Sequence, residues 1–450
     1  MSKDIRIRKG LDIKLVGAAE STISDATRSN IYAIRPDDFH GIIPKVIAKE
    51  GTEVKAGQPL FHSKANDKLL FPSPVSGEVV EIVRGAKRKI LYFKILADKQ
   101  QNFAEYNTQN VASLDAKQIK EHLLASGCWP FIKQRPYDII ANPDESPKSI
   151  FISGYATAPL AANLDFILKG KEKELQAAVT ALGKLTEGKV HVSLGKKSDS
   201  PLSSLQDVQI HQVSGPHPAG NVGVQINKVD PINKGETVWV VQPQDLVIIG
   251  ELLLTGKFNA ERVVAVAGSS IKRPQYYKAK IGAEVSTMIY DAGVNDGNIR
   301  VISGDVLTGV NVKPDGYLGF YNNLITVIPE GNDYEFFGWN KPVFNKISVT
   351  RALTFSWLMP KKKYELDTNT NGEHRAFVVT GLYEDVLPMD IYPLQLLKAC
   401  VVNDLDAMEQ LGMYEVAPED FALTEFVCVS KQPHQQIIRE GLDLMIKEIG

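Results

Sequence analysis

Five residues in the middle of the chain have side chains that could hold or stack against a flat, uncharged ligand. Four of them alternate along one short stretch, and the fifth lies within a Gly-Pro-His-Pro sequence: Trp129, Phe131, Lys133, Arg135 and His217. Aromatic rings supply face contacts worth about 0.5–1.5 kcal/mol. A lysine or arginine can hydrogen-bond a ligand oxygen. The alternative is structural: the rings fill a cavity, and the histidine bonds the backbone of a rigid turn.

An α/β segment surrounds the first four of these residues. The sequence predicts a helix over 115–126, a strand over 149–153, a helix over 160–182 and a strand over 189–194. Such a βαβ unit is parallel and right-handed, and it binds nucleotides where a glycine-rich turn brings backbone N–H groups to phosphate. The turn over 153–159 has a single glycine. We therefore expect no phosphate cradle and no bound nucleotide.

Composition excludes several classes of protein. The net charge of −2 gives no general attraction to nucleic acid, so no nucleic-acid partner is expected. The three cysteines are far apart, which predicts neither a zinc site nor a disulfide framework. The apolar run over 246–254 is broken by Gly250 and Glu251 and is shorter than the roughly 20 residues that span a bilayer. The N-terminus has no apolar signal region, so the expected location is the cytoplasm.

The first hundred residues read as short strands between glycine and proline turns. The sequence V-x-x-x-E-G-T-E-V-K-A-G-Q-P-L-F over 46–61, followed by S-P-V-S-G over 73–77, resembles the biotinyl/lipoyl-type barrel-sandwich module. In a carrier of that type a lysine holds the cofactor, and the candidate here is Lys68. It precedes Gly77 by fewer residues than is usual in carriers. The resemblance therefore implies a scaffold with an unmodified lysine, and a biotin or lipoyl carrier is the alternative.

The central segment also resembles two families of electron-transfer subunits. The order barrel-sandwich, α/β domain and β-grasp is that of RnfC, and the last two parts occur in the flavin-bearing subunit of respiratory complex I. Those relatives carry a glycine-rich flavin loop. The equivalent stretch over 126–136, S-G-C-W-P-F-I-K-Q-R-P, keeps the opening Ser-Gly and loses the later glycines. Their acidic turn appears here over 153–159 without its carboxylates. The resemblance implies that this chain binds no cofactor tightly.

The rest of the chain follows the same order of domains. Residues 261–329 resemble a soluble-ligand-binding (SLBB) β-grasp domain. RnfC carries two iron–sulfur motifs near its C-terminus, and one cysteine of eight remains at the equivalent positions: Phe377, Thr380, Tyr383, Leu387, Pro418, Phe421, Thr424 and Cys428. Apolar packing is expected to replace cluster binding there. A mixed aromatic and lysine stretch over 357–364 suits a lipid headgroup surface, an acidic partner loop or a solvated loop.

A longer signature spans 214–256 and reads S-G-P-H-P-A-G-N-V-G-V-Q-I-N-K-V-D-P-I-N-K-G-E-T-V-W-V-V-Q-P-Q-D-L-V-I-I-G-E-L-L-L-T-G. It resembles the A subunits (NqrA) of Na⁺-translocating NADH:ubiquinone reductases. The resemblance implies a peripheral subunit on the cytoplasmic side of the bacterial inner membrane. Electrons pass in that complex from NADH to quinone, coupled to Na⁺ export. This chain would be structural and quinone-proximal, with the membrane subunits, foremost the B subunit, as partners and no activity when isolated.

Two alternative functions stay open from the sequence. One is a flavin-dependent NADH dehydrogenase subunit, and the other is an RnfC-like electron-transfer subunit. The expected fold is a multidomain α+β and α/β chain. Its predicted parts are a barrel-sandwich domain over 1–105, a Rossmann-like domain with a degenerate flavin site over 106–258, an SLBB-like β-grasp domain over 259–332 and a helical domain over 333–450.

Overall fold

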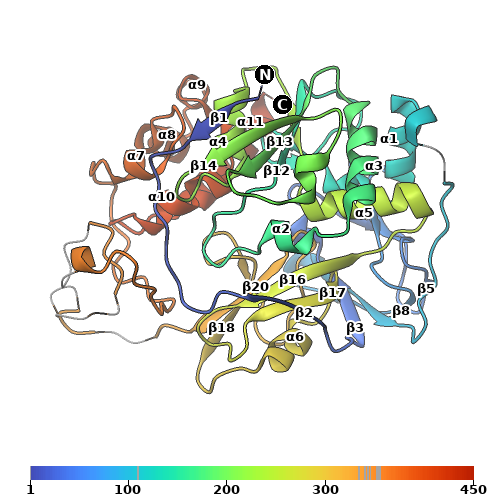
Figure 1. The fold of residues 1–450 in the computed structure, drawn as a ribbon, viewed down its shortest axis with the longest axis horizontal. Helices are drawn as coiled ribbons and strands as arrows, with labels where there is room; N and C mark the ends of the chain where they lie inside the picture. The colour runs from blue at the N-terminus through green and yellow to red at the C-terminus, as the bar shows by residue number, and fades with distance from the viewer. Residues whose placement is uncertain are drawn as a thin grey trace.

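The computed structural model describes residues 2–108, 111–332, 335–338, 341, 344, 346–350 and 356–449. Among these residues the strands form four sheets, and most of the longer helices lie around the largest sheet and at the C-terminal end of the chain (Figure 1). No helix in these ranges is long and apolar enough to cross a bilayer.

Two small sheets make up the N-terminal module. Their strands are β3 (Ile31–Ile34), β4 (Pro44–Val46), β5 (Glu53–Val54), β6 (Pro59–Ser63), β7 (Leu70–Pro72), β8 (Gly77–Arg84) and β9 (Ile90–Ala97). One sheet has the order β3-β9-β8-β5 and the other β4-β6-β7. The ring of Phe61 stacks on Phe71 and on Phe93, with centroids 4.5 and 4.9 Å apart, and so joins the two sheets. Lys68 is exposed in the turn between β6 and β7.

The central sheet carries the α/β part of the chain. Its strands are β1 (Asp4–Arg6), β10 (Lys133–Arg135), β11 (Ile139–Ile140), β12 (Ser149–Ser153), β13 (Val190–Gly195), β14 (Gln209–Ser214) and β15 (Val238–Val240). Within the described residues their order is β1-β14-β13-β12-β15-β10-β11. The strands from β1 to β15 are parallel, and β10 and β11 are antiparallel additions. The strand order reverses between β12 and β15, the place where open parallel sheets form their binding crevice.

Five helices accompany this sheet in the described part of the chain: α1 (Ala116–Ala125), α2 (Leu164–Ile167), α3 (Glu172–Gly183), α4 (Val222–Val229) and α5 (Pro243–Thr255). The predicted strands and the helix over 115–126 are confirmed. The prediction of one helix over 160–182 is wrong, because the chain turns between α2 and α3 at Gly170, whose φ is +78°. Glycine reaches that left-handed conformation without the cost that a Cβ imposes.

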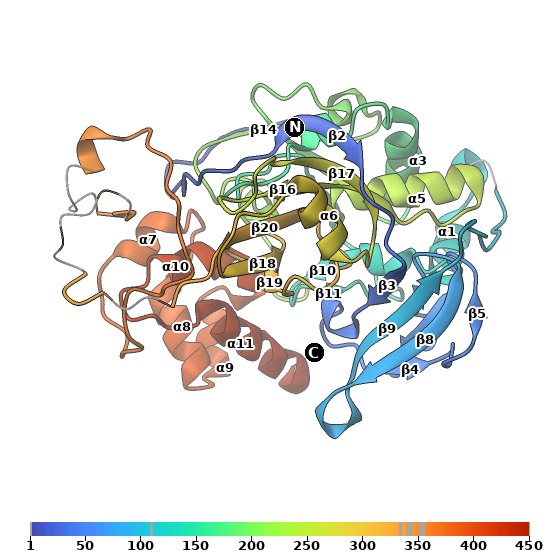
Figure 2. The ribbon, with the colours of Figure 1, turned by 90° about the horizontal axis from the view of Figure 1, so that it is seen from below.

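A third sheet follows in sequence and lies beside the central one (Figure 2). Its strands are β2 (Glu20–Asp25), β16 (Glu261–Ala267), β17 (Gln275–Lys280), β18 (Ile299–Ser303), β19 (Val310–Asn311) and β20 (Leu324–Pro329), accompanied by α6 (Val285–Ala292). The N-terminal segment links the two sheets, since β1 pairs with β14 and β2 pairs with β17. Sequence analysis did not anticipate this link, because residues 20–25 are mostly exposed and show no apolar alternation.

The C-terminal region is helical where the structure describes it. Its helices are α7 (Leu382–Val386), α8 (Pro393–Val401), α9 (Leu405–Gln410), α10 (Ala422–Phe426) and α11 (His434–Glu448). Four of the eight positions compared with the RnfC cysteines, Tyr383, Leu387, Phe421 and Cys428, lie in one apolar core, whereas Thr380 is exposed. In this core Tyr383 Oη and Cys428 Sγ are 2.9 Å apart. Burial, together with the Cys428 thiol, raises the pKa of Tyr383. No group of three or more candidate ligands for a metal ion occurs among the described residues.

Acid is expected to destabilise the fold through its buried histidines. Burial lowers the pKa of His434 to about 4, so this side chain is neutral in the folded protein. The unfolded chain therefore binds more protons between the ordinary histidine pKa of about 6.5 and pH 4, and the free energy of unfolding falls as the pH drops through that window. At pH 5 the loss from one such histidine is at most about 2 kcal/mol.

The measurement is urea unfolding at pH 7 and pH 5. His434→Gln removes the titrating ring while keeping a polar partner for Thr424, whose Oγ1 is 2.9 Å from Nδ1 of the ring. We expect the variant to lose less stability than the parent chain between the two pH values. Equal losses in the two chains would contradict the assignment.

Candidate functional site

The two aromatic candidates face the interior of the protein. Both belong to a single 3-10 turn, Trp129–Phe131, and both side chains are buried. The indole of Trp129 donates to the carbonyl of Ala141 at 2.7 Å and meets Trp239 edge to face. Phe131 is stacked with Phe320, with ring centroids 4.9 Å apart. In this conformation neither ring presents an open face to a ligand.

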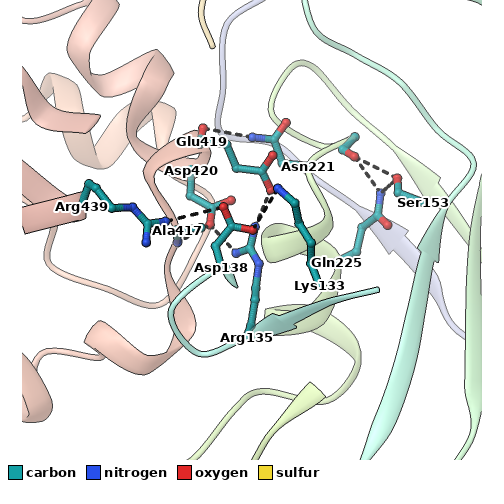
Figure 3. A network of polar contacts seen from close by, with 11 residues as sticks. Lys133, Arg135, Asp138, Ser153, Asn221, Gln225, Ala417, Glu419, Asp420 and Arg439 are labelled. Atoms are coloured by element: carbon teal, nitrogen blue, oxygen red, sulfur yellow. Dashed lines mark hydrogen bonds and ion pairs between the residues drawn. The ribbon is translucent and has the colours of Figure 1, made fainter. Parts of the chain in front are cut away.

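Lys133 and Arg135 follow on β10 and point to one side of it, because side chains alternate along a strand. Arg135 is buried and reaches the C-terminal region, where it binds two consecutive acids of the 3-10 turn Pro418–Phe421 (Figure 3). Its Nη1 is 2.7 Å from Oδ2 of Asp420, and its Nη2 binds Glu419. This pair of bonds ties the central sheet to the helical region.

The charges in this network are set by their neighbours. Burial acts to lower the pKa of Arg135, but the carboxylates of Asp420 and Glu419 raise it by more, so the guanidinium stays charged. Burial and the carboxylates of Asp420 and Asp138 raise the pKa of Glu419 above its ordinary value, while Arg135 acts to lower it, and the side chain still reaches solvent. One oxygen of Asp420, Oδ1, is buried without a hydrogen-bond partner among the described residues.

A second group of charges lies beside Arg135, at the rim of the network. Asp138 Oδ1 is 3.8 Å from Lys133 Nζ, and its Oδ2 is 3.6 Å from Arg439 Nη2 on α11. Burial acts to raise the pKa of Asp138, but Lys133, Arg135 and Arg439 bring it below its usual range. The ammonium of Lys133 also lies 4.6 Å from the ring centroid of Tyr321, a favourable cation–π distance. This partly exposed pair is the accessible part of the site.

The start of helix α4 lies on the other side of the ion pair between Arg135 and Asp420. Gln225 on α4 donates to Ser153 Oγ at 2.8 Å, and this hydroxyl donates to the carbonyl of Gly220 at 2.9 Å (Figure 3). A Cβ added at Gly223 would lie 2.5 Å from both carboxylate oxygens of Asp420 and nearer still to Arg135. Helix N-termini at such crevices commonly bind phosphate. Here the chain's own ion pair occupies the space beside the first turn of α4.

His217 lies on the same edge of the sheet but belongs to a separate group of contacts. Its Nδ1 is 3.1 Å from Thr157 Oγ1, and its backbone N–H donates to Asp12 Oδ1 at 2.9 Å. Burial lowers its pKa, so the ring is neutral. Among the described residues none of its hydrogen bonds reaches the stretch over 129–135. His217 therefore joins the loops after β12 and β14 to the N-terminal segment.

Comparison with known proteins gives matches along the chain. Family models match three successive regions: the NqrA N-terminal barrel-sandwich hybrid domain over 5–98, the NqrA second alpha/beta domain over 114–258 and the NQRA C-terminal domain over 263–313. The A subunit of the Na⁺-translocating NADH-quinone reductase of Haemophilus influenzae Rd is 37% identical over 99% of this chain and 100% of its own. The corresponding A subunit of Neisseria meningitidis MC58 is 36% identical over the same shares.

This chain belongs to the family of Na⁺-translocating NADH-quinone reductase A subunits. The family resemblance inferred from the sequence is thereby confirmed, as are the barrel-sandwich hybrid, the following α/β domain and the mixed α/β character of the chain. An NAD⁺-reducing [NiFe]-hydrogenase in its H2-reduced state superposes with a TM-score of 0.35 at 12% identity, over 49% of this chain and 48% of that one. A likeness this weak carries no argument.

Sequence analysis of this NqrA family member singled out Arg135 but missed its partners. Glu419 and Asp420 follow Pro418 in a segment whose other residues are largely apolar. Two consecutive acids in such a segment were the sequence feature that could have indicated a buried ion pair. Asp420 lies 285 residues after Arg135, so no local sequence pattern predicts their contact. Asp138 and Arg439 were also missed, because Asp138 is close to Lys133 in sequence but its other partner, Arg439, lies about 300 residues further along the chain.

Proposed function

We propose that the chain acts as the A subunit of a Na⁺-translocating NADH:quinone reductase, on the cytoplasmic side of the bacterial inner membrane. The observation that carries this proposal is the identity of 37% across 99% of this chain and the full length of a relative of that name. The complex would pass electrons from NADH to ubiquinone coupled to Na⁺ export, and the other subunits would be this chain's partners, the B subunit foremost among them.

The test is deletion of the chain from a bacterium that makes the complex. Membranes without the chain should lose NADH:quinone reductase activity and NADH-driven Na⁺ transport, and added purified chain should restore both. The isolated chain should have no such activity. Full activity in membranes that lack the chain would contradict the proposal.

We further propose the finer fold assignments, a Rossmann-like central domain and an SLBB-like β-grasp domain. The first is supported by the parallel order β14-β13-β12-β15 with its reversal beside β12. The second is supported by α6 packing on the sheet formed by β16, β17, β18 and β20. The first assignment puts the start of α4, beside which the ion pair of Arg135 and Asp420 lies, at the crevice outside the carboxyl ends of the central strands.

We propose that this crevice holds no tightly bound cofactor of its own. Support comes from the ion pair between Arg135 and Asp420, which lies against Gly223 at the start of α4, where a cofactor phosphate would bind. The purified chain is expected to be colourless. An absorbance spectrum with a flavin or iron–sulfur band at near-unit occupancy would contradict this and favour the flavin-dependent dehydrogenase or the RnfC-like protein instead.

We also propose that the chain's role is structural and quinone-proximal, with quinone meeting the partly exposed pair of Lys133 and Tyr321. An ammonium group can donate to a quinone oxygen, and an aromatic ring can contact the quinone face. Trp129 and Phe131 then support the site from behind, since their rings are buried. The buried Arg135 would hold β10 in place through its bonds to the C-terminal region, and His217 would fix the neighbouring loops.

Lys133→Met in the assembled complex is expected to raise the KM for quinone about tenfold, the size of a lost hydrogen bond to a charged group, with a smaller change in kcat. A photoreactive quinone analogue should label the peptide over 129–136. Lys196→Met is the matched control, because that lysine is exposed and belongs to a surface ion pair. Labelling confined to other subunits, together with an unchanged KM, would leave this chain as a scaffold without quinone contact.

A further inference from the structure

One part of the C-terminal region exposes large apolar side chains that its own core does not cover. It comprises the described residues 335–338, 344, 346–350 and 356–364, and we call it the aromatic lobe. Figure 1 shows it in orange at the left, projecting from the body of the molecule. Five of its apolar side chains are more than half exposed: Phe336 at 83%, Phe337 at 54%, Phe344 at 56%, Trp357 at 60% and Leu358 at 58%. A cluster of this kind on a soluble protein marks an interaction surface.

Polar contacts connect the separate segments of the aromatic lobe. Lys346 Nζ is 2.6 Å from Glu335 Oε2, which links the segment that bears Phe336 to the segment that follows Phe344. Lys362 Nζ donates to the carbonyl of Phe344 and so links that segment to the stretch that bears Trp357. The exposed apolar side chains therefore belong to one connected surface.

The base of the aromatic lobe is fixed to the N-terminal segment of the chain. The backbone N–H of Tyr364 donates to the carbonyl of Lys14 at 2.7 Å, and that of Val16 donates to the carbonyl of Tyr364 at 3.1 Å. Lys14 Nζ also donates to the carbonyl of Pro360 at 2.9 Å. These bonds lie within a few residues of the 3-10 turn Ser356–Leu358, so the position of Trp357 and Leu358 is set by the body of the protein.

The chemistry of the aromatic lobe fits a protein partner. Tryptophan and phenylalanine are typical anchors at the centres of protein interfaces. Lys361 and Lys363 are exposed a few residues after Trp357, and within the described residues neither ammonium group has a hydrogen-bond or ion-pair partner. They would face carboxylates of the partner. Anchors in a lipid surface are typically long amphipathic helices, whereas the helical part of this lobe is one turn of three residues.

We propose that the aromatic lobe is the surface through which this chain docks on another subunit of the reductase. The partner surface would offer an apolar seat for Trp357 and Leu358, flanked by acidic side chains. The inference rests on the proposed function, and it deepens that function by assigning the contact to residues of this chain.

The test uses the assembled complex, purified in detergent through a tag on another subunit. Trp357→Ala/Leu358→Ala is expected to reduce the amount of this chain that co-purifies about tenfold or more, as loss of central interface anchors does. Lys361→Glu/Lys363→Glu should reduce it less, and its effect should shrink at high salt. Tyr290→Ala on α6 is the matched control, since Tyr290 is a similarly exposed aromatic residue on another domain, and it should co-purify as the parent chain does.

Both lobe residues are exposed, so the variants should keep the parent's thermal unfolding midpoint, which is measured in parallel. Undiminished co-purification of Trp357→Ala/Leu358→Ala would overturn the docking proposal. Vesicles of phosphatidylglycerol and phosphatidylethanolamine test the lipid alternative. The docking proposal would also be overturned if the purified chain bound these vesicles through Trp357 and co-purification did not depend on Trp357. Failure of the parent chain to co-purify would instead contradict its proposed place in the complex.

Discussion

Arg135→Met is expected to lower the free energy of unfolding by about 3–5 kcal/mol, the usual cost of removing one partner of a buried ion pair. The side chains of Arg135 and Asp420 are both buried and are 2.7 Å apart. Methionine has a similar length and no charge, so the variant leaves the carboxylate of Asp420 buried without its cation. Loss of the arginine destabilises the Glu419 carboxylate less, because this side chain reaches solvent and water can solvate it. Urea unfolding at pH 7 measures the change.

Two further variants make this test specific. Lys196→Met breaks an ion pair with Asp4 of similar length, 2.8 Å, at the surface, and it should cost no more than about 1 kcal/mol. Arg135→Met/Asp420→Leu removes both buried charges, so the double variant should be more stable than Arg135→Met alone. The interpretation fails if Arg135→Met costs no more than Lys196→Met, or if the second substitution brings no recovery.

The sequence predicted those parts of the fold whose pattern is local. The strand over 149–153 coincides with β12, and the helix over 115–126 contains α1, because apolar periodicity is set by near neighbours along the chain. The strands β1 and β2 could not be predicted in this way. Each pairs with a strand roughly two hundred residues or more away, and β2 is mostly exposed. The kink at Gly170 was missed because apolar spacing runs through it.

In the candidate site, too, local sequence indicated residue types, whereas distant residues decided their surroundings. Residue types identified Lys133 and Arg135 as groups that bind oxygen atoms, and the structure places both among carboxylates. For Trp129 and Phe131 the sequence allowed either ligand stacking or core filling, since an aromatic side chain serves both. Their burial is decided by Trp239 and Phe320, which lie far away in sequence. Whether quinone meets this part of the chain stays a prediction.

Gly250→Ala is expected to destabilise the chain by about 3 kcal/mol, at the upper end of the cost of overpacking a core. Gly250 lies within α5, where that helix packs against α3. A Cβ at this position would lie 2.5 Å from the carbonyl carbon and 2.8 Å from the Cα of Glu174, and nearer still to the carbonyl oxygen. These are backbone atoms of a second helix, so no side-chain rotation relieves the clash.

Gly183→Ala is the matched control, because Gly183 is also helical, at the end of α3. Its added Cβ would meet nothing closer than Val190 Cγ2, at 3.9 Å. Alanine is favoured over glycine in helices by about 0.5–1 kcal/mol, so this variant should be as stable as the parent or more so. Alanine gains the same helix propensity at Gly250. Only the clash with Glu174 therefore makes the Gly250→Ala variant less stable than the parent. Thermal and urea unfolding of the two variants therefore measure the clash directly, and a Gly250→Ala chain as stable as Gly183→Ala would show that α3 and α5 can separate without cost.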